Sequence, residues 1–418
     1  MIKSIDNKLF ILFTIAIIVS VSTMLYMGAI STFDTASYIS AWDNSLSIGL
    51  VDLWRTPVYP VFLGICKVLF GACYLRWVIV IQNLLFIVSI GFLWDILLKV
   101  TSSRSITFWI SLVYSFSPGI VAMNNYLLTE SLAISLSIFL AHSLLSLFLS
   151  ETWKTTVSFT IFLVFVIFLR PAQVYVLPIL LLVFASLLLF KGKRSVALKG
   201  LAGLMFASLM LLLYVFAFHN SFNVYSPSGI SVLNQYYIGS SNGLITHDKL
   251  YHREIEKFFS DSYGADTDMA SVVKIKSAID NLGLDVVADE VHISMRRNPV
   301  GWVKAVLFNL YRSGFQRLFE FGPLSKLMGP LSIKMSSVYC FMIVFAVLLC
   351  FSIIRSGHVP WFMSTIFLLV AGNLAISIVG AQAEWGRLAF PSVPLLLLMF
   401  GVLCSLFNVD SSRFSHLF

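Results

Sequence analysis

Ten apolar runs, most of them long enough to cross a bilayer, constrain this chain more than any other feature of its sequence. They cover residues 9–29, 77–98, 106–122, 131–149, 155–169, 174–190, 198–218, 335–354, 360–379 and 388–407. A helix needs about 20 mostly apolar residues to span the hydrocarbon core. With 58% hydrophobic and only 11% charged residues, the 418-residue chain has too few polar groups for an ordinary soluble domain. The sequence therefore predicts an all-α integral membrane protein with about ten transmembrane helices.

Residues 57–71 form an eleventh apolar stretch, which is too short to span the bilayer and differs in composition from the ten longer runs. It opens with two prolines, Pro57 and Pro60, and contains Lys67. Such a segment favours a juxtamembrane helix that lies at the interface, within the first loop on the outer side. This placement decides the orientation of every later helix.

Basic residues support that orientation. On the side that also holds both termini, the short segments carry Lys3, Lys8, Lys99, Arg104, Lys154, Lys191, Lys193, Arg194, Lys199, Arg355 and Arg413. Short segments on the other side carry Arg55, Lys67, Arg76, Arg170 and Arg387. Lys and Arg accumulate in cytoplasmic loops, so eleven against five predicts cytoplasmic termini. We expect a multi-pass protein of a bacterial inner (plasma) membrane.

The chain divides into three parts. Residues 1–218 form an N-terminal transmembrane module, residues 219–334 an extracytoplasmic insertion, and residues 335–418 the C-terminal transmembrane helices. Acidic starts and basic ends predict helices at 268–282 and 285–297, because such charges complement the helix dipole. Apolar residues at helical spacing predict an amphipathic helix at 299–319 that lies on the outer leaflet.

Several other classes of protein lack their signatures here. The net charge of +8 includes no basic block interleaved with aromatic residues in a soluble stretch, so nucleic acid is not an expected partner. The histidines lack zinc spacing, and Walker and Gly-x-Ser-x-Gly motifs are absent from the sequence. Nucleotide hydrolysis and serine-hydrolase chemistry are therefore not expected.

The first outward loop, residues 31–56, is the best candidate for chemistry. It contains Asp34, Asp43, Asp52 and Arg55 directly after the first apolar run. At headgroup depth, a carboxylate can take a proton from a hydroxyl while a guanidinium holds a phosphate. Asp43 and Asp52 are better explained as solubilising charges, and the same hydrated loop is the alternative explanation for Asp34 and Arg55.

This arrangement resembles the GT-C superfamily of polyprenyl-phosphate-sugar-dependent glycosyltransferases, which includes protein O-mannosyltransferases and lipid A aminoarabinose transferases. In that family the first outward loop has a catalytic acid, then a tyrosine, then a basic residue before a proline and an aromatic. The matching positions are Asp34, Tyr38, Arg55, Pro57 and Tyr59. The family often has two adjacent acids, whereas Asp34 is followed by Thr35.

Three further positions match. Glu130, at the outer end of a predicted span, resembles the family's carboxylate that faces the first-loop acid. Arg170 before Pro171 resembles a basic residue before proline, and Glu384 with Arg387 resembles the arginine motif before the last span. Capping a helix N-terminus is the alternative role for Glu130, and snorkelling toward headgroups is the alternative for the two arginines.

The resemblance implies an inverting transfer of a sugar from a polyprenyl-phosphate donor to an envelope glycan, lipid or protein. Asp34 would act as the general base, and Arg55 with Arg387 or Arg170 would stabilise the phosphate. Tyr38, Tyr59 and Glu384 would contact substrate, and Glu130 would hold either a divalent cation or the acceptor. A polymerase or a transporter of lipid-linked oligosaccharide is the alternative function.

Overall fold

The protein is built from helices. The structure, a computed structural model, describes residues 7–48, 51–245, 279, 283–316, 333–356, 360–380 and 388–408. These residues contain no β-strand, and Ile30 and Tyr126 form an isolated parallel bridge. The predicted all-α architecture is confirmed.

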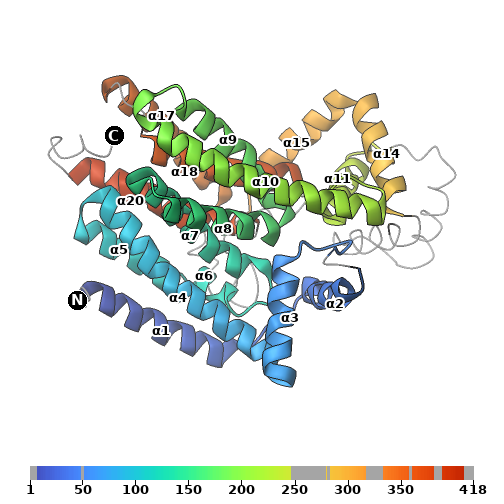
Figure 1. Cartoon of the computed structure of the whole chain (residues 1–418), viewed down its shortest axis with the longest axis horizontal. Helices are drawn as coiled ribbons and strands as arrows, with labels where there is room; N and C mark the ends of the chain where they lie inside the picture. Colours follow the sequence, from blue (N-terminus) through green and yellow to red (C-terminus); the bar gives the residue numbers. More distant parts are fainter. Residues whose placement is uncertain are drawn as a thin grey trace.

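The helices run largely side by side along the long axis of the molecule (Figure 1). Their bounds are α1 (Asn7–Met27), α2 (Phe33–Ile48), α3 (Val58–Phe70), α4 (Tyr74–Thr101), α5 (Arg104–Phe116), α6 (Pro118–Met123), α7 (Thr129–Ser150), α8 (Trp153–Leu169), α9 (Val176–Leu187), α10 (Arg194–Phe222), α11 (Gly229–Ser241), α14 (Leu284–Arg297), α15 (Pro299–Ser313), α17 (Met335–Ser356), α18 (Trp361–Gly380) and α20 (Val393–Asn408). Short 3₁₀ turns include η1 (Gly71–Cys73), η2 (Pro171–Tyr175), η3 (Lys191–Lys193) and η5 (Phe390–Ser392).

Six helical segments of the described chain are long and apolar enough to cross a membrane. They are Asn7–Met27, Val58–Thr101, Thr129–Ser150, Lys191–Phe222, Met335–Ile354 and Trp361–Val379, and three shorter apolar segments are Trp153–Leu169, Pro171–Leu187 and Phe390–Ser405. The predicted run at 106–122 is divided into α5 and α6, because Ser117 is extended before Pro118. A multi-helix membrane protein is therefore supported, while the count of ten spans stays a prediction.

The segment 57–71, expected to lie at the interface, forms α3. Gly71 follows it with φ 54° and ψ −132°, a conformation that favours glycine, and η1 then leads into α4. The chain changes direction there, and α3 runs crosswise to α1 and α4 (Figure 1).

Four of the lysines that the charge pattern assigns to the side of the termini lie at helix ends at one end of the bundle. Lys8 begins α1, Lys99 ends α4, Lys154 begins α8 and Lys191 lies between α9 and α10. These helix ends lie together at the left of Figure 1, whereas α2, α11 and α14 lie at the right. The fold thus separates the two sets of loops that the charge pattern distinguishes.

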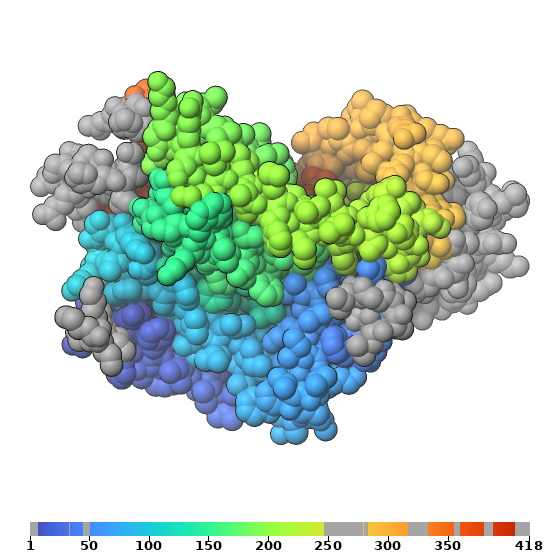
Figure 2. All heavy atoms as spheres, viewed as in Figure 1, coloured from blue at the N-terminus to red at the C-terminus, as the bar shows by residue number. Residues whose placement is uncertain are grey.

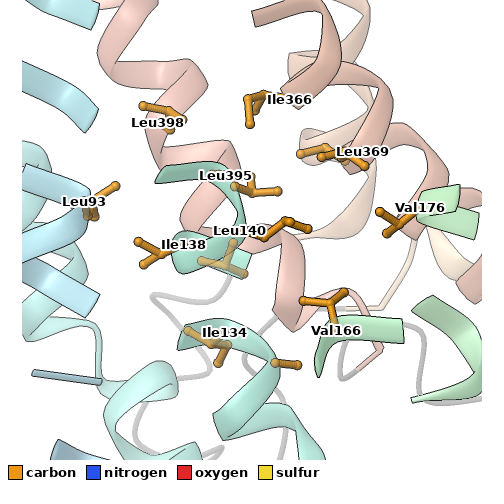
Figure 3. Packing of buried hydrophobic residues seen from close by; sticks show 14 of the residues in the cluster. Leu93, Ile134, Ile138, Leu140, Val166, Val176, Ile366, Leu369, Leu395 and Leu398 are labelled. Atoms are coloured by element: carbon orange, nitrogen blue, oxygen red, sulfur yellow. The ribbon is translucent and has the colours of Figure 1, made fainter. Parts of the chain in front are cut away.

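Helix α7 forms the centre of the bundle. Its residues Ile134, Ile138 and Leu140 are buried among Leu93 of α4 and Leu395 of α20 (Figure 3). In a bilayer the lipid tails are as apolar as these side chains, so close van der Waals packing between the helices stabilises this core. The first turn of α7, which carries Glu130, is therefore held by a dense core.

The insertion has a second apolar core of its own. Leu233 of α11, Val291 of α14 and Trp302 of α15 are buried there, together with Val51 from the first outward segment. Figure 2 shows a notch between the green atoms of the α9–α10 region and the orange atoms of α15. Helices α14 and α15 occur where the sequence predicts them, and the predicted helix at 268–282 lies almost wholly outside the described residues.

Candidate active site

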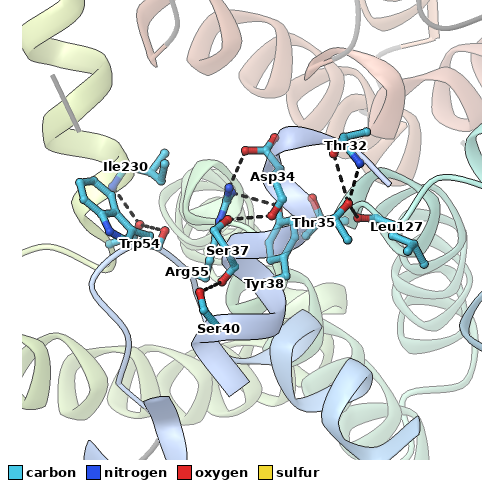
Figure 4. A network of polar contacts seen from close by, with 12 residues as sticks. Thr32, Asp34, Thr35, Ser37, Tyr38, Ser40, Trp54, Arg55, Leu127 and Ile230 are labelled. Atoms are coloured by element: carbon cyan, nitrogen blue, oxygen red, sulfur yellow. Dashed lines mark hydrogen bonds and ion pairs between the residues drawn. The ribbon is translucent and has the colours of Figure 1, made fainter. Parts of the chain in front are cut away.

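Asp34 and Arg55 form the closest ion pair of the first outward segment (Figure 4). Asp34 lies in the first turn of α2, and its Oδ1 accepts a hydrogen bond from Nη2 of Arg55 at 2.5 Å. Nε of Arg55 donates to Oγ of Ser37 at 2.8 Å, and Ser37 in turn donates to the carbonyl of Asp34 at 2.7 Å. The side chain of Asp34 is 25% exposed and that of Arg55 13%, so solvent reaches the pair from the carboxylate side.

A tight turn holds the backbone at Arg55. Oδ1 of the buried Asp52 accepts hydrogen bonds from the backbone N–H groups of Trp54 at 2.8 Å and Arg55 at 2.9 Å. The turn is anchored to the insertion, since Ser228 donates through Oγ to the carbonyl of Trp54 at 2.7 Å. Asp52, expected to be a solubilising charge, is therefore a structural acceptor.

Tyr38 lies beneath the guanidinium of Arg55. The Arg55 Cζ atom sits 4.1 Å from the ring centroid, and Nη1 donates to the tyrosine hydroxyl at 3.1 Å. Burial raises the pKa of Tyr38, with the Arg55 charge acting in the opposite direction. A neutral phenol at this position supports the arginine without competing for its charge.

Tyr59 supports Tyr38 from within the bundle. The two rings meet edge to face at 4.8 Å, and Tyr59 is fully buried. Its hydroxyl donates to Oε1 of Gln82 at 3.0 Å, and Nε2 of Gln82 donates to the carbonyls of Asn124 at 2.9 Å and Tyr126 at 3.0 Å. Tyr59 thus connects the first outward segment to the chain that precedes α7.

The start of α2 is docked on that same stretch. Ile30 accepts a backbone hydrogen bond from Leu127 at 3.0 Å and donates to Asn125 at 2.8 Å. Thr35 donates through Oγ1 to the carbonyl of Leu127 at 3.2 Å. These contacts bring two segments more than ninety residues apart in the sequence to one place.

Glu130 and Arg170 make a second ion pair at the N-terminal end of α7. Oε1 of Glu130 lies 3.6 Å from Nη2 of Arg170, which caps the end of α8 before η2. Their side chains are 2% and 10% exposed. Thr129 donates to Oε2 of Glu130 at 3.3 Å, and both Thr129 and Glu130 lie close enough to Tyr38 to act on the pKa of its phenol, so the two pairs adjoin at this tyrosine.

The structure places the sequence-predicted residues in three groups. Asp34, Tyr38 and Arg55 are in direct contact, Glu130 and Arg170 form the adjoining pair, and Tyr59 lies behind Tyr38. The predicted Glu384 and Arg387 lie outside the described residues.

Three participants were not identified from the sequence. Ser37 lies in the segment predicted as a loop, which the structure forms into α2, Thr129 lies just before a predicted span and Gln82 lies inside one. No charge or motif marks them. Of these three, Gln82 could have been suspected from the sequence, because an amide within an apolar run usually has a hydrogen-bond partner inside the protein.

Within the part of the chain that the structure describes, no three histidine, cysteine or carboxylate side chains come close enough to suggest a metal site. The expected cation at Glu130 would lie beside the guanidinium of Arg170, whose charge would repel it. The donor set described at this position does not fit a divalent cation.

No protein-family model and no curated protein matches the chain. Its fold is similar to the crystal structure of the Archaeoglobus fulgidus oligosaccharyltransferase, with a TM-score of 0.55 and 14% identity over 96% of this chain and 50% of that one. It is also similar to the oligosaccharyltransferase AglB of the same organism, in complex with an inhibitory peptide and a dolichol-phosphate. That match has a TM-score of 0.50 and 12% identity, over 96% and 52% of the two chains.

The chain thus spans about half the length of the solved structures that it matches. The likeness shows that the chain shares its fold with these two membrane enzymes, without distinguishing a subtype. At identities this low it concerns the fold alone.

Proposed function

We propose that the chain is a GT-C-type membrane glycosyltransferase that moves a sugar from a polyprenyl-phosphate donor to an extracytoplasmic acceptor. The observation that carries the proposal is the contact between Asp34 and Arg55, which joins a carboxylate to a guanidinium at 2.5 Å at the end of the bundle remote from the basic loops. Acid–base chemistry and phosphate binding both need these groups. The fold similarity to oligosaccharyltransferases supports this assignment.

The proposed reaction is a single displacement at the anomeric carbon. An acceptor hydroxyl gives its proton to the carboxylate of Asp34 as its oxygen forms the new bond to that carbon. The bond from the anomeric carbon to the phosphate oxygen breaks, and the lipid phosphate leaves with the electron pair. Attack opposite the leaving group inverts the anomeric configuration. A phosphate leaves readily, so the protein needs to stabilise its charge more than to protonate it.

The ion pair couples these two events. While Asp34 is ionised, it balances the positive charge of Arg55 at 2.5 Å. Once Asp34 accepts the proton, the charge of Arg55 becomes available to the departing phosphate. Stabilisation therefore increases in the transition state, where it accelerates the reaction, and not in the bound donor.

The remaining predicted residues take different parts in this proposal. Tyr38 orients Arg55, and Tyr59 supports Tyr38 without touching substrate, because its ring packs behind Tyr38 and its hydroxyl is bound to Gln82. Glu130 contacts the substrate instead of a cation, because Arg170 supplies the neighbouring positive charge. Glu384 and Arg387 keep the substrate-binding role that the sequence motif suggests.

We also propose the membrane placement. The basic helix ends face the cytoplasm with both termini, which puts Asp34 and the insertion on the opposite side of a bacterial inner membrane. Helix α3 lies along that outer interface, in keeping with its crosswise course. The ten predicted spans then include the three shorter apolar helices and the divided run at 106–122.

Transfer of an oligosaccharide to a protein is the second candidate. It is favoured by one of the similar structures, whose complex contains a peptide and a dolichol-phosphate. A lipid-linked oligosaccharide polymerase would use comparable outward arginines. The donor separates these functions, since transfer of a single sugar from a monophosphate indicates the first proposal, transfer of a whole oligosaccharide to a peptide the second, and use of an oligosaccharide diphosphate a polymerase.

The experiment is a transfer assay with the full chain in liposomes. Polyprenyl phosphates carrying one radiolabelled sugar are supplied with extracted envelope glycan, lipid A or peptide as acceptor. We expect release of bare polyprenyl phosphate in step with labelling of one acceptor. Mass analysis of lipid-linked sugars in cells lacking the gene should show the same donor accumulating. Turnover of oligosaccharide diphosphates alone would reject the single-sugar proposal.

A further inference from the structure

Buried polar atoms without partners gather beside the active site. Among the described residues, Nη1 of Arg170 and Nδ2 of Asn124 are buried and make no hydrogen bond. Asn124 is tied to the start of α7, since its Oδ1 accepts from Ser131 at 2.7 Å. Buried polar groups are nearly always hydrogen-bonded, so unused donors next to Glu130 indicate a place where another molecule supplies the acceptor.

The charge at this place differs from that at Arg55. Arg170 is 8% exposed and lies 3.6 Å from Glu130, a residue that takes no proton in the proposed displacement. The charge of Arg170 therefore stays balanced throughout the reaction. A phosphate brought here would face the carboxylate of Glu130 in a poorly solvated site, which disfavours an anion.

A hydroxyl group fits the pair better than an anion does. It can donate to the carboxylate of Glu130 and accept from Nη1 of Arg170 at once. Two adjacent hydroxyls, as on a sugar ring, would use both oxygens of the carboxylate and the second donor of the fork. The chemistry of the pair therefore selects a neutral polyhydroxylated ligand.

The two pairs are close enough to hold adjoining parts of one molecule. The hydroxyl of Tyr38 accepts from Nη1 of Arg55 at 3.1 Å and lies beside Thr129, whose own hydroxyl donates to Glu130 at 3.3 Å. A single tyrosine hydroxyl thus separates the guanidinium of Arg55 from the start of α7. In a sugar phosphate, the hydroxyls of the ring likewise lie only a few bonds from the phosphate, so one molecule can reach both ion pairs.

We propose that Glu130 and Arg170 form a subsite for adjacent hydroxyls of the transferred sugar, next to a phosphate site at Arg55. This inference rests on the proposed function and adds to it the residues that recognise the sugar. Because Glu130 is 1% exposed, the neighbouring ring of Tyr38 moves aside to let the sugar reach it. Arg55 then binds the phosphate and Arg170 the sugar.

The test compares two lipids on the full chain in nanodiscs. One is a short-chain polyprenyl phosphate, and the other is the same lipid carrying glucose, galactose, mannose or arabinose. Wild type should bind at least one sugar-bearing lipid more tightly than the bare one. Glu130→Gln and Arg170→Lys should each weaken that lipid about tenfold, a typical effect of one lost charged hydrogen bond, and change the bare lipid less than about twofold. Arg55→Gln should weaken both.

Three results would overturn the proposal. Equal weakening of both lipids by Glu130→Gln and Arg170→Lys would place the phosphate, not the sugar, at this pair. Unchanged binding with a lowered melting temperature would make the pair structural only. If wild type binds bare and sugar-bearing lipids equally, the sugar subsite fails while the lipid-phosphate function stands; if it binds neither, the proposed function itself fails.

Discussion

Two aspartates contact a basic side chain at the same distance, at opposite ends of the helix bundle. Asp34 meets Arg55 at 2.5 Å near the insertion, and Asp95 meets Lys99 at 2.5 Å near the basic loops, with Nε2 of His142 at 2.9 Å from the same Asp95 oxygen. Lys99 is one helical turn from Asp95 in α4, whereas Arg55 follows Asp34 by 21 residues. The distances alone do not separate a functional pair from an ordinary one.

Their surroundings do separate them. The side chains of Asp95 and Lys99 are 41% and 40% exposed, and exposed pairs of this kind contribute about 0–1 kcal/mol to stability. Arg55 is held by the turn at Asp52, the hydroxyl of Ser37 and the ring of Tyr38. A charge fixed on so many sides is pre-organised for a ligand, and a charge on a flexible lysine is not.

The largest expected effect comes from Asp34→Asn. The amide cannot accept the acceptor's proton, and losing a positioned base typically costs about 10²–10⁴-fold in rate. Sugar transfer in liposomes measures the loss. Asp43→Asn is the matched control, because Asp43 lies in the same helix as Asp34 and forms an exposed ion pair with Lys67 of α3. Transfer by Asp34→Asn at the wild-type rate would show that Asp34 is not the base.

Arg55→Gln should have the next largest effect. It removes the charge that stabilises the leaving phosphate, and loss of one such donor costs about 10²–10³-fold in kcat. Steady-state kinetics with a sugar-bearing polyprenyl phosphate provide the measurement. Lys67→Gln, at a cation that faces solvent, should change kcat less than about twofold. If Arg55→Gln and Lys67→Gln lower kcat equally, the contacts that fix Arg55 have no special role in stabilising the phosphate.

Gly64→Ala tests whether the packing of α2 positions Asp34. A methyl group on Gly64 of α3 would overlap the indole of Trp42 in α2, so the two helices must separate. Misplacing a catalytic group by about 1 Å can cost up to about 100-fold, and we expect a loss of roughly 10- to 100-fold in kcat. The control is Gly192→Ala, since nothing lies within 4 Å of that added methyl group. Full activity of Gly64→Ala would show that the packing of α2 on α3 does not position Asp34.

The smallest effect should come from Asp95→Asn. The exposed pair with Lys99 is worth about 0–1 kcal/mol, so the melting temperature and the rate of transfer should change little, the rate by less than about twofold. Thermal unfolding in detergent and the liposome assay check both values. A loss of activity comparable to that of Asp34→Asn would show that the Asp95 pair is also needed for transfer, so exposure would not distinguish the two ion pairs.

Much of the fold follows from sequence pattern. The apolar runs at 9–29, 131–149 and 335–354 correspond to α1, α7 and α17, because helix formation in a bilayer depends on local composition. The run at 106–122 was predicted as one span and is two helices. Pro118 disfavours helical backbone at Ser117, a local rule that hydropathy does not include.

The site is only partly predictable for a different reason. Order and sidedness singled out Asp34, Arg55, Glu130 and Arg170, and the structure pairs them two by two. The pairing itself depends on Ile30 docking on Tyr126 and on the turn at Asp52. These contacts join distant segments, and their free energy depends on the whole bundle.

The sequence by itself determined that the chain is a helical membrane protein, since apolar content and spacing act through local burial in lipid. It also predicts which acids and arginines share one side of the membrane, because loop charge sets orientation. Only the tertiary structure decided that Arg55 belongs to Asp34 and Arg170 to Glu130. Charges compete for partners through space, so the packing of α2, α7 and α8 selects each pair, and no spacing along the chain encodes it.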